Sequence, residues 1–441
     1  MNMLHRSRFA GVLLLVLAGL LLSRPIAASH FRSAEVRWCM TGDPAATGTA
    51  RFFLELAERR FANQQVGDTH VEYFDFGDGG SIQAPLTVVE VQETAGWFLA
   101  RGVVTHRYQN PPFPPNARFE GCCRINGENG NDFLNNRSSD EFNVRAAVNP
   151  YAEGECSPAV DLPPIVWLSG GLGDTFTIPI PVSHPRPVLC RFATDAEVGG
   201  PYGEPNPNGM TIDADTCVIT WTPTSGDTNA LWTTQVRVEE AERLPYLSTA
   251  VDFLLGLDAV PPVCRLSVSS GPPVQLRLSF QDSKSGLSRI EVLTAENVNV
   301  FIPPFTPGET GERVGSGTKI DQNRPGWLTI RVTDLAGNET DCDPVITQVI
   351  RATGRPETQT YAGVPPAERV VTILNGDPGL KQVQIDVNGR RFNVSGLQDG
   401  EKRTLDVGAA IVTGIDSTFK LTPHGKPGGT AEVVIWDGNQ L

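Results

Sequence analysis

Apolar and polar residues alternate along short segments in every part of the chain downstream of its first residues. Leu276, Leu278 and Phe280 alternate with polar neighbours, and the same period recurs from Leu328 to Val332. A period of two is typical of a β-strand with one buried face. No segment combines such strands with helices of the length that a parallel sheet requires. The pattern therefore predicts an all-β fold of tandem β-sandwich modules.

The clearest local prediction is a hairpin centred on Asn388-Gly389, the pair preferred in a two-residue type I′ turn. The register of this turn predicts four cross-strand pairs: Val383 with Val394, Ile385 with Phe392, Gln384 with Asn393, and Asp386 with Arg391. Both faces agree with one register. Elsewhere, residues 51–61 combine strand spacing with helix-forming residues, and we predict a strand there.

Proline-rich links divide the strands into modules. The chain contains 44 Gly and 35 Pro, which suits frequent turns between short strands. Leu162-Pro163-Pro164 and Pro261-Pro262 separate consecutive strand-rich segments. Since a sandwich takes about 100 residues, we expect a signal peptide over residues 1–28 and modules over residues 29–155, 160–257, 259–350 and 355–441.

Two segments of the second module predict strands of different kinds. Residues from Ile178 to Val182 place their aliphatic side chains on one face, and Pro179 and Pro181 confine such a strand to a sheet edge. Val236 and Val238 alternate with polar residues, which predicts a strand with one buried and one exposed face.

The N-terminus has the features of an export signal. Basic residues precede an apolar run from Phe9 to Leu22, and small residues near Ala28 provide a cleavage site. The run is too short to span a bilayer comfortably. Cleavage would remove three of the 36 basic residues and none of the 50 acidic ones, which leaves a formal charge of −17. We expect a secreted or cell-surface protein that does not bind nucleic acid, because such binding requires basic patches.

Two sets of motifs in the N-terminal segment resemble known families. Residues 74–79 (Phe-Asp-Phe-Gly-Asp-Gly), with Thr105-His106-Arg107-Tyr108 downstream, resemble the polycystic-kidney-disease-type (PKD) repeat, an immunoglobulin-like sandwich in which this Gly-Asp-Gly shapes a turn. Residues 29–32, 122–125 and 162–166 together resemble the N-terminal region of exported repeat-containing proteins.

The next two modules also show resemblances. Residues 209–213 and 217–223 are similar to the dystroglycan-type cadherin-like domain, which usually has Gly where Cys217 stands. Residues 282–287 and 332–338 look like bacterial surface immunoglobulin-like repeats. These resemblances imply immunoglobulin-like or cadherin-like sandwiches, a fold that serves many functions.

Eight Cys in an exported chain predict disulfides rather than a zinc site. The module boundaries predict the pairs Cys190–Cys217 and Cys264–Cys342. Cys122 and Cys123 are adjacent, and successive strand residues point to opposite faces, so we expect each to pair elsewhere. Cys39 and Cys156 remain as their partners in either arrangement. Of the two, we favour the pairs Cys39–Cys123 and Cys122–Cys156.

No catalytic motif accompanies these modules, and we do not expect an enzyme. The histidines are scattered, and Gly170-Gly171-Leu172-Gly173 lacks the Lys-Ser/Thr of a phosphate loop. Calcium is the one ligand that the residue types favour, since it takes oxygen ligands in loops. Three loops are candidates: Asp75 with Asp78; residues 126–132; and Asp282, Asp334 and Asn338. The alternative is that these residues only form turns.

Export, tandem sandwiches and the lack of a catalytic motif predict a binding or adhesion protein, with an extracellular protein or glycan as its partner. An alternative is a carbohydrate-binding accessory protein, in which exposed Trp97, Trp232 or Trp327 would stack on sugar rings. A hydrolase is the third possibility. Exposure of the Trp side chains distinguishes the first two.

Overall fold

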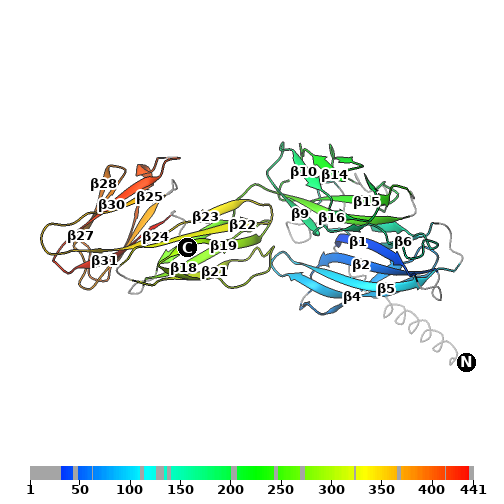
Figure 1. The fold of residues 1–441 in the computed structure, drawn as a ribbon, viewed down its shortest axis with the longest axis horizontal. Coiled ribbons are helices and arrows are strands. Elements are labelled where there is room, and N and C mark those ends of the chain that lie inside the picture. Colours follow the sequence, from blue (N-terminus) through cyan, green and yellow to red (C-terminus); the bar gives the residue numbers. More distant parts are fainter. Residues whose placement is uncertain are drawn as a thin grey trace, which may run out of the picture. The chain divides into compact units, whose positions relative to one another are not determined.

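The computed structural model of the chain is built almost entirely from β-strands (Figure 1). It describes residues 31–42, 48–61, 63–109, 114–125, 134–136, 141–199, 206–242, 247–268, 274–321, 324–364, 369–412 and 414–436. The all-β prediction is confirmed. The predicted signal peptide lies outside the described residues.

The strands are divided into four groups at the predicted module boundaries. The first group is β1 (Phe31–Met40), β2 (Thr49–Arg59), β3 (Thr69–Asp75), β4 (Ser81–Gln92), β5 (Trp97–Arg107), β6 (Asn116–Gly121) and β7 (Phe142–Ala147). The second is β8 (Ala159–Val160), β9 (Ile165–Ser169), β10 (Phe176–Pro179), β11 (Val182–Ser183), β12 (Val188–Phe192), β13 (Thr211–Asp213), β14 (Val218–Trp221), β15 (Trp232–Glu240) and β16 (Ser248–Asp258).

The remaining strands form two further groups. The third is β17 (Val263–Val268), β18 (Gln275–Gln281), β19 (Leu287–Glu296), β20 (Val298–Phe301), β21 (Arg313–Lys319), β22 (Gly326–Asp334), β23 (Glu339–Cys342) and β24 (Val345–Ile350). The fourth is β25 (Gln359–Val364), β26 (Val370–Asn375), β27 (Gln382–Val387), β28 (Arg390–Ser395), β29 (Lys402–Asp406), the 3-10 turn η2 (Gly408–Ala410), β30 (Ser417–His424) and β31 (Thr430–Trp436).

By their internal contacts, the four groups join into two compact units. The first unit comprises residues 1–91, 97–165 and 175–254, and the second comprises residues 92–96, 166–174 and 255–441. Each unit therefore contains most of two predicted modules.

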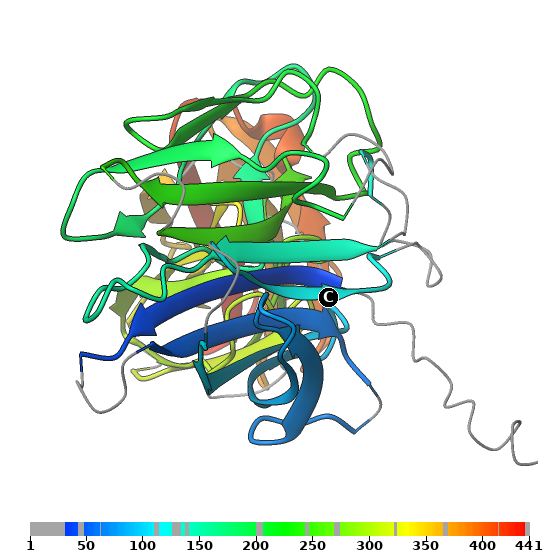
Figure 2. The same cartoon turned by 90° about the vertical axis from the view of Figure 1, so that its right-hand side faces the viewer.

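One continuous sheet joins the first two groups of strands. Its order is β12-β15-β16-β1-β2-β5-β4-β3-β6-β7, and β9 also pairs with β16. The joint is the antiparallel pairing of β16 with β1, which sets Ala34 opposite Asp252 and Val36 opposite Ala250. Figure 2 shows the blue strands of the first group and the green strands of the second within this unit. The sheet thus crosses the predicted boundary between residues 29–155 and 160–257.

Strands β15 and β16 are buried on both faces, unlike the half-exposed strand predicted for residues 235–239. Every residue of both strands is buried, including Arg237 and Glu239. A strand in the middle of a shared sheet has protein on each side, so its polar side chains must find partners there. Arg237 donates to the Glu197 carboxylate at 2.6 Å, which compensates part of its desolvation.

A buried ion pair lies where β16 meets the loop after β6. The Arg124 guanidinium donates to both carboxylate oxygens of Asp252 at 2.6 and 3.0 Å, and both side chains are almost fully buried. Arg124 also donates to Thr233 on β15 at 2.9 Å and packs over the ring of Phe31 on β1. This bidentate arrangement ties three strands and a loop to one register.

The second unit repeats the principle of a shared sheet. Its seven-stranded sheet runs β19-β22-β24-β31-β26-β29, with β23 beside β22, and so combines strands of the third and fourth groups. On β31, Val434 and Trp436 pack into the core of the third module. Their neighbours Val433 and Ile435 pack into the core of the fourth. The near-continuous apolar sequence of β31 is therefore explained by burial on both faces.

The hairpin prediction at Asn388-Gly389 is confirmed. Strands β27 and β28 have the predicted register, with Val383 opposite Val394 and Ile385 opposite Phe392. Both turn residues have positive φ, 51° for Asn388 and 89° for Gly389, as a type I′ turn requires. The strand predicted over residues 51–61 is also present, as β2.

The single edge strand predicted from Ile178 to Val182 is instead two strands in different sheets. β10 ends at Pro179 and lies at the edge of the β10-β14-β13 sheet, whereas β11 begins at Val182 and pairs with β8. Pro181 lies between them and has no N–H to extend the first ladder. The prolines thus end the strand as well as restricting it to an edge.

Four disulfides join all eight Cys, and two of the pairs are the predicted Cys190–Cys217 and Cys264–Cys342. The other two predicted pairs, Cys39–Cys123 and Cys122–Cys156, are wrong. Cys39 is bonded to Cys156, and Cys122 to its neighbour Cys123. The rule that adjacent side chains point apart holds only within a strand, and β6 ends at Gly121, so it does not apply to the two Cys that follow.

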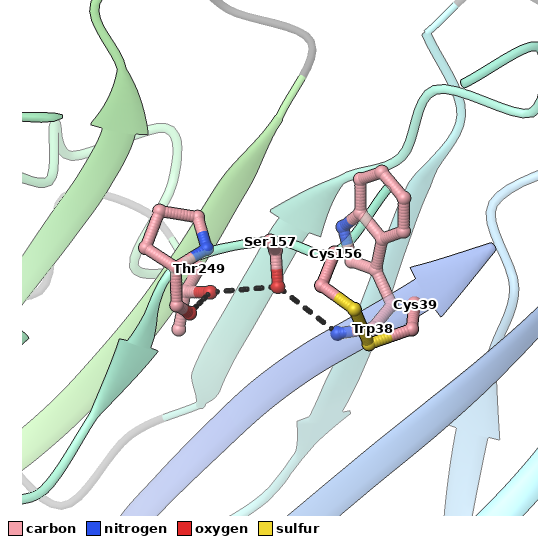
Figure 3. Close-up of a disulfide and its surroundings, with 6 residues drawn as sticks. Trp38, Cys39, Cys156, Ser157 and Thr249 are labelled. Atoms are coloured by element: carbon pink, nitrogen blue, oxygen red, sulfur yellow. Dashed lines mark hydrogen bonds between the residues drawn. A yellow bond between two sulfur atoms is a disulfide. The ribbon is translucent and has the colours of Figure 1, made fainter. Parts of the chain in front are cut away.

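The Cys39–Cys156 disulfide lies beside a small hydrogen-bond network (Figure 3). The backbone N–H of Trp38 donates to the Ser157 hydroxyl at 3.0 Å, and the Ser157 N–H donates to the Trp38 carbonyl at 2.8 Å. The Thr249 hydroxyl on β16 donates to Ser157 at 2.9 Å. The segment after β7 is thereby held to both β1 and β16.

We predict that peptide mapping without reduction recovers a cross-linked peptide joining Cys39 to Cys156. The double substitution of both residues by Ser should destabilise the first unit by about 4 kcal/mol or more, because the bond closes a loop with a sequence separation of 117. A peptide joining Cys39 to Cys123 would contradict the structure.

We also predict that Val434→Ala and Val433→Ala each destabilise the third and fourth modules together, by roughly 2 kcal/mol. The reason is that both residues belong to one strand shared by two cores. Native-state hydrogen exchange should show β18 and β27 losing protection by equal amounts in either variant. If Val434→Ala affected β18 alone and Val433→Ala affected β27 alone, the two modules would be independent.

Candidate metal centre

Three buried carboxylates converge in the second unit. Asp258 is the last residue of β16, Asp282 follows β18, and Asp334 is the last residue of β22. Their exposed fractions are 0%, 4% and 1%, and one oxygen of each lies within 4.8 Å of the others. The cluster thus combines one strand end with the turns that follow two other strands.

The turn after β18 is folded around the Asp282 side chain. Its Oδ1 accepts hydrogen bonds from the backbone N–H groups of Lys284 at 3.0 Å and Gly286 at 2.7 Å. Gly286 has a φ of +85°, and a Cβ there would lie 2.4 Å from the Gly308 carbonyl oxygen, so only glycine fits. The Asp-x-x-x-Gly spacing of this loop is therefore required by its conformation.

The turn between β22 and β23 positions Asp334 and Asn338 in a similar way. The Asn338 backbone N–H and its side-chain amide both donate to the Asp334 carboxylate at 2.8 Å. The same amide donates to the backbone carbonyl of Asp258 at 2.9 Å. Asn338 therefore connects two of the acidic residues by donating its amide hydrogens.

The sequence predicted a calcium set of Asp282, Asp334 and Asn338. The structure brings Asp282 and Asp334 together, gives Asn338 the role of a hydrogen-bond donor, and adds Asp258. Sequence reasoning missed Asp258 because it falls between the predicted modules of residues 160–257 and 259–350 and far along the chain from the other two aspartates. One signal was available: Asp258 ends the apolar run of β16, directly before the Pro261-Pro262 link.

The electrostatics of the cluster favour a cation. Burial raises the pKa of Asp334, the hydrogen bonds from Asn338 lower it, and the charges of Asp282 and Asp258 raise it further; the net direction is upward. Among the described residues, none of the three carboxylates takes part in a salt bridge with Lys, Arg or His. A hard divalent ion with oxygen ligands would relieve this repulsion, and Ca²⁺ has that preference.

The other two candidate calcium loops have different outcomes. Asp78 contacts His106 at 2.7 Å and Asp75 contacts Arg118 at 2.9 Å, so both carboxylates already have cationic or hydrogen-bonding partners. The ring of His106 also stacks on Phe76, with 4.0 Å between centroids. The two carboxylates also accept hydrogen bonds from the backbone N–H groups of Gly77 and Gly80, at 2.7 and 3.0 Å, and so shape the turn between β3 and β4. The loop of residues 126–132 lies outside the described residues.

The tryptophans proposed for sugar stacking are not exposed. Trp97 and Trp232 have exposed fractions of 8% and 4%. Trp327 is half-buried and packs against the core of the fourth module. The low exposure of these Trp side chains therefore argues against the hypothesis that they stack on sugar rings.

Comparison with known proteins gives one family match. Residues 32–151 match the model described as integrin beta-like protein A–E, N-terminal, an extracellular β-rich family. Neither a PKD nor a cadherin family is matched. No curated protein matches the chain. Together with the four disulfides, the family match indicates an extracellular protein.

Solved structures resemble the chain only distantly. The secreted serine protease VesC from Vibrio cholerae is 8% identical over 95% of this chain and 99% of its own, with a TM-score of 0.17. SGBP-B of the Bacteroides ovatus mixed-linkage glucan utilization locus, solved with a mixed-linkage heptasaccharide, is 10% identical over 83% and 89%, with a TM-score of 0.15. Similarity this low supports no inference about function. Within the described residues, no helix is long and apolar enough to cross a membrane.

The raised pKa of Asp334 predicts how the stability of the metal-free chain depends on pH. An acid whose folded-state pKa is raised contributes stability below its unfolded pKa, and this contribution is lost as pH rises through the folded pKa. Asp282→Asn removes one repelling charge and keeps the Oδ1 acceptor. In chelator, the variant should therefore gain stability relative to the parent chain as the pH rises above about 4, where the unfolded carboxyl group ionises. Urea titrations at each pH measure this difference, and a difference that stays constant with pH would contradict the prediction.

Proposed function

We propose that this chain is a non-enzymatic extracellular binding protein whose second unit is stabilised by a bound Ca²⁺ ion. The observation that carries the calcium part is the convergence of Asp258, Asp282 and Asp334, three buried acidic residues within 4.8 Å. The binding part is supported by the match of residues 32–151 to an extracellular β-rich family.

The ion would act on the chain where β16 leads into the third module. Asp258 ends that strand, whereas Asp282 follows β18 and Asp334 ends β22 in the third module. Oxygen ligands from all three would fasten the end of β16 to the turn after β18 and to the end of β22. Calcium would thereby stiffen a scaffold whose loops contact an extracellular protein or glycan, in keeping with an absence of catalysis.

Calcium should raise the melting temperature of the second unit by about 5–10 °C at a concentration near 100 times the dissociation constant. This range follows from a stabilisation of roughly 2.7 kcal/mol in a unit of this size. Differential scanning calorimetry with Ca²⁺ and with chelator measures the shift. Asp282→Asn should abolish it.

Asp386→Asn provides a matched control, because Asp386 lies in the β27–β28 hairpin of the same unit, away from the cluster. It should retain the full calcium shift. Equal melting curves with calcium and chelator for the parent chain would refute the calcium proposal. To test the binding proposal, the purified chain is used to capture extracellular partners. The same material is also assayed with peptide, ester and glycoside substrates, and turnover of any of them would refute a non-enzymatic role.

A further inference from the structure

A second group of metal-ligating side chains lies in the first unit, apart from the acidic cluster. Glu58 stands near the end of β2, and His70 and Glu72 lie two residues apart on β3. Residues with this spacing share one face of a strand, so both β3 side chains point toward Glu58. The candidate ligand atoms of all three lie within 4.8 Å of one another.

His70 Nε2 lies close to carboxylate oxygens of both Glu58 and Glu72. This nitrogen lies 3.2 Å from Glu58 Oε2 and 3.5 Å from Glu72 Oε2. The ligand atoms of a tetrahedral zinc site with bonds of about 2.1 Å are roughly 3.4 Å apart, which these two distances bracket. The Nε2 atom is buried and lies within reach of both carboxylates.

The surroundings hold the imidazole in this position. Phe98 on β5 packs edge-on against the His70 ring, with 5.0 Å between the centroids. Phe98 is fully buried and lies opposite Glu58 in the β2–β5 ladder. The same aromatic side chain thus fixes the ring beside the carboxylate. Glu58 is fully buried, whereas the side chains of His70 and Glu72 are 13% and 18% exposed, which leaves an approach from solvent.

We propose that Glu58, His70 and Glu72 form a binding site for a transition-metal ion, with Zn²⁺ as the best match. An imidazole nitrogen with two carboxylates is a ligand set that suits zinc, whereas calcium takes oxygen ligands only. The partial exposure of the site allows water to serve as a further ligand.

A proton on His70 Nε2 would compete with the metal ion for this position. Burial lowers the pKa of His70, but its contacts with Glu58 and Glu72 outweigh this effect and raise the pKa to about 9. A protonated His70 would make a simple ion pair and leave no lone pair for a metal. The two states are distinguished by adding the metal alone.

Isothermal titration of the full chain with ZnCl₂, after treatment with chelator, tests the proposal. One Zn²⁺ should bind in the first unit, and Co²⁺ at the same site should show the visible absorption of tetrahedral coordination. His70→Gln and Glu72→Gln should each weaken binding by about tenfold or more, because each removes a direct ligand. Asp386→Asn, whose substitution lies in neither cluster, should bind Zn²⁺ with unchanged affinity.

His106→Gln is the matched control, since His106 is also partly buried but contacts a single carboxylate, that of Asp78, among the described residues. It should keep the zinc affinity of the parent chain. Melting curves in chelator identify any variant that fails to fold. A parent chain that binds no Zn²⁺, or equal zinc affinities for His70→Gln and His106→Gln, would overturn the proposal and leave His70 as a member of an ion pair.

Discussion

Burial of single strands on both faces is the constraint on which this structure depends. β31 contributes Val434 to one hydrophobic core and Val433 to another, and every residue of β15 and β16 is buried. Each such strand belongs to a continuous sheet that is covered on both faces. The apolar area that an isolated sandwich would leave in water is thereby buried, at about 25 cal/mol for each Å².

This arrangement also determines where the charged residues can lie. In a sandwich with one wet face, Arg237, Glu239 and Asp252 would point into solvent, but on shared strands they are buried. Each is therefore engaged by a partner of opposite charge, and Asp252 is held by the bidentate guanidinium of Arg124. Removing one member of that pair would leave the other charge buried and uncompensated. The resulting loss of folding free energy is larger than the net stabilisation that the intact pair provides. The buried ion pairs thus specify the register in which β16 joins β1.

Two groups of side chains gather oxygen or nitrogen atoms that could hold a metal ion. Asp258, Asp282 and Asp334 are brought together by a strand end and two turns, each turn shaped by hydrogen bonds to its own aspartate. Glu58, Glu72 and His70 instead belong to two strands of one sheet. Calcium would suit the oxygen-only group in the turns, and zinc the group that contains an imidazole.

How much of this could be read from the sequence depends on the range of each interaction. The half-buried strands around Leu278 and Ile330 and the Asn388-Gly389 hairpin follow from local alternation and turn chemistry, so they were predicted. The apolar sequences of β16 and β31 indicate that each strand is buried on both faces. They do not indicate which modules each strand joins. Asp258 escaped the calcium prediction because its proximity to Asp282 arises from tertiary contacts, and the bond between Cys122 and Cys123 was missed because a strand rule was applied beyond the end of a strand.

The central claim is that shared sheets fuse the four modules into two cooperative units. The most direct measurement is single-molecule force unfolding of the chain from its two ends, with the disulfides intact. Two unfolding events are expected for each molecule, because β16 cannot leave β1, nor β31 leave β24 and β26, without exposing residues that are buried on both faces of the strand. Four independent events, each the size of one predicted module, would contradict the account.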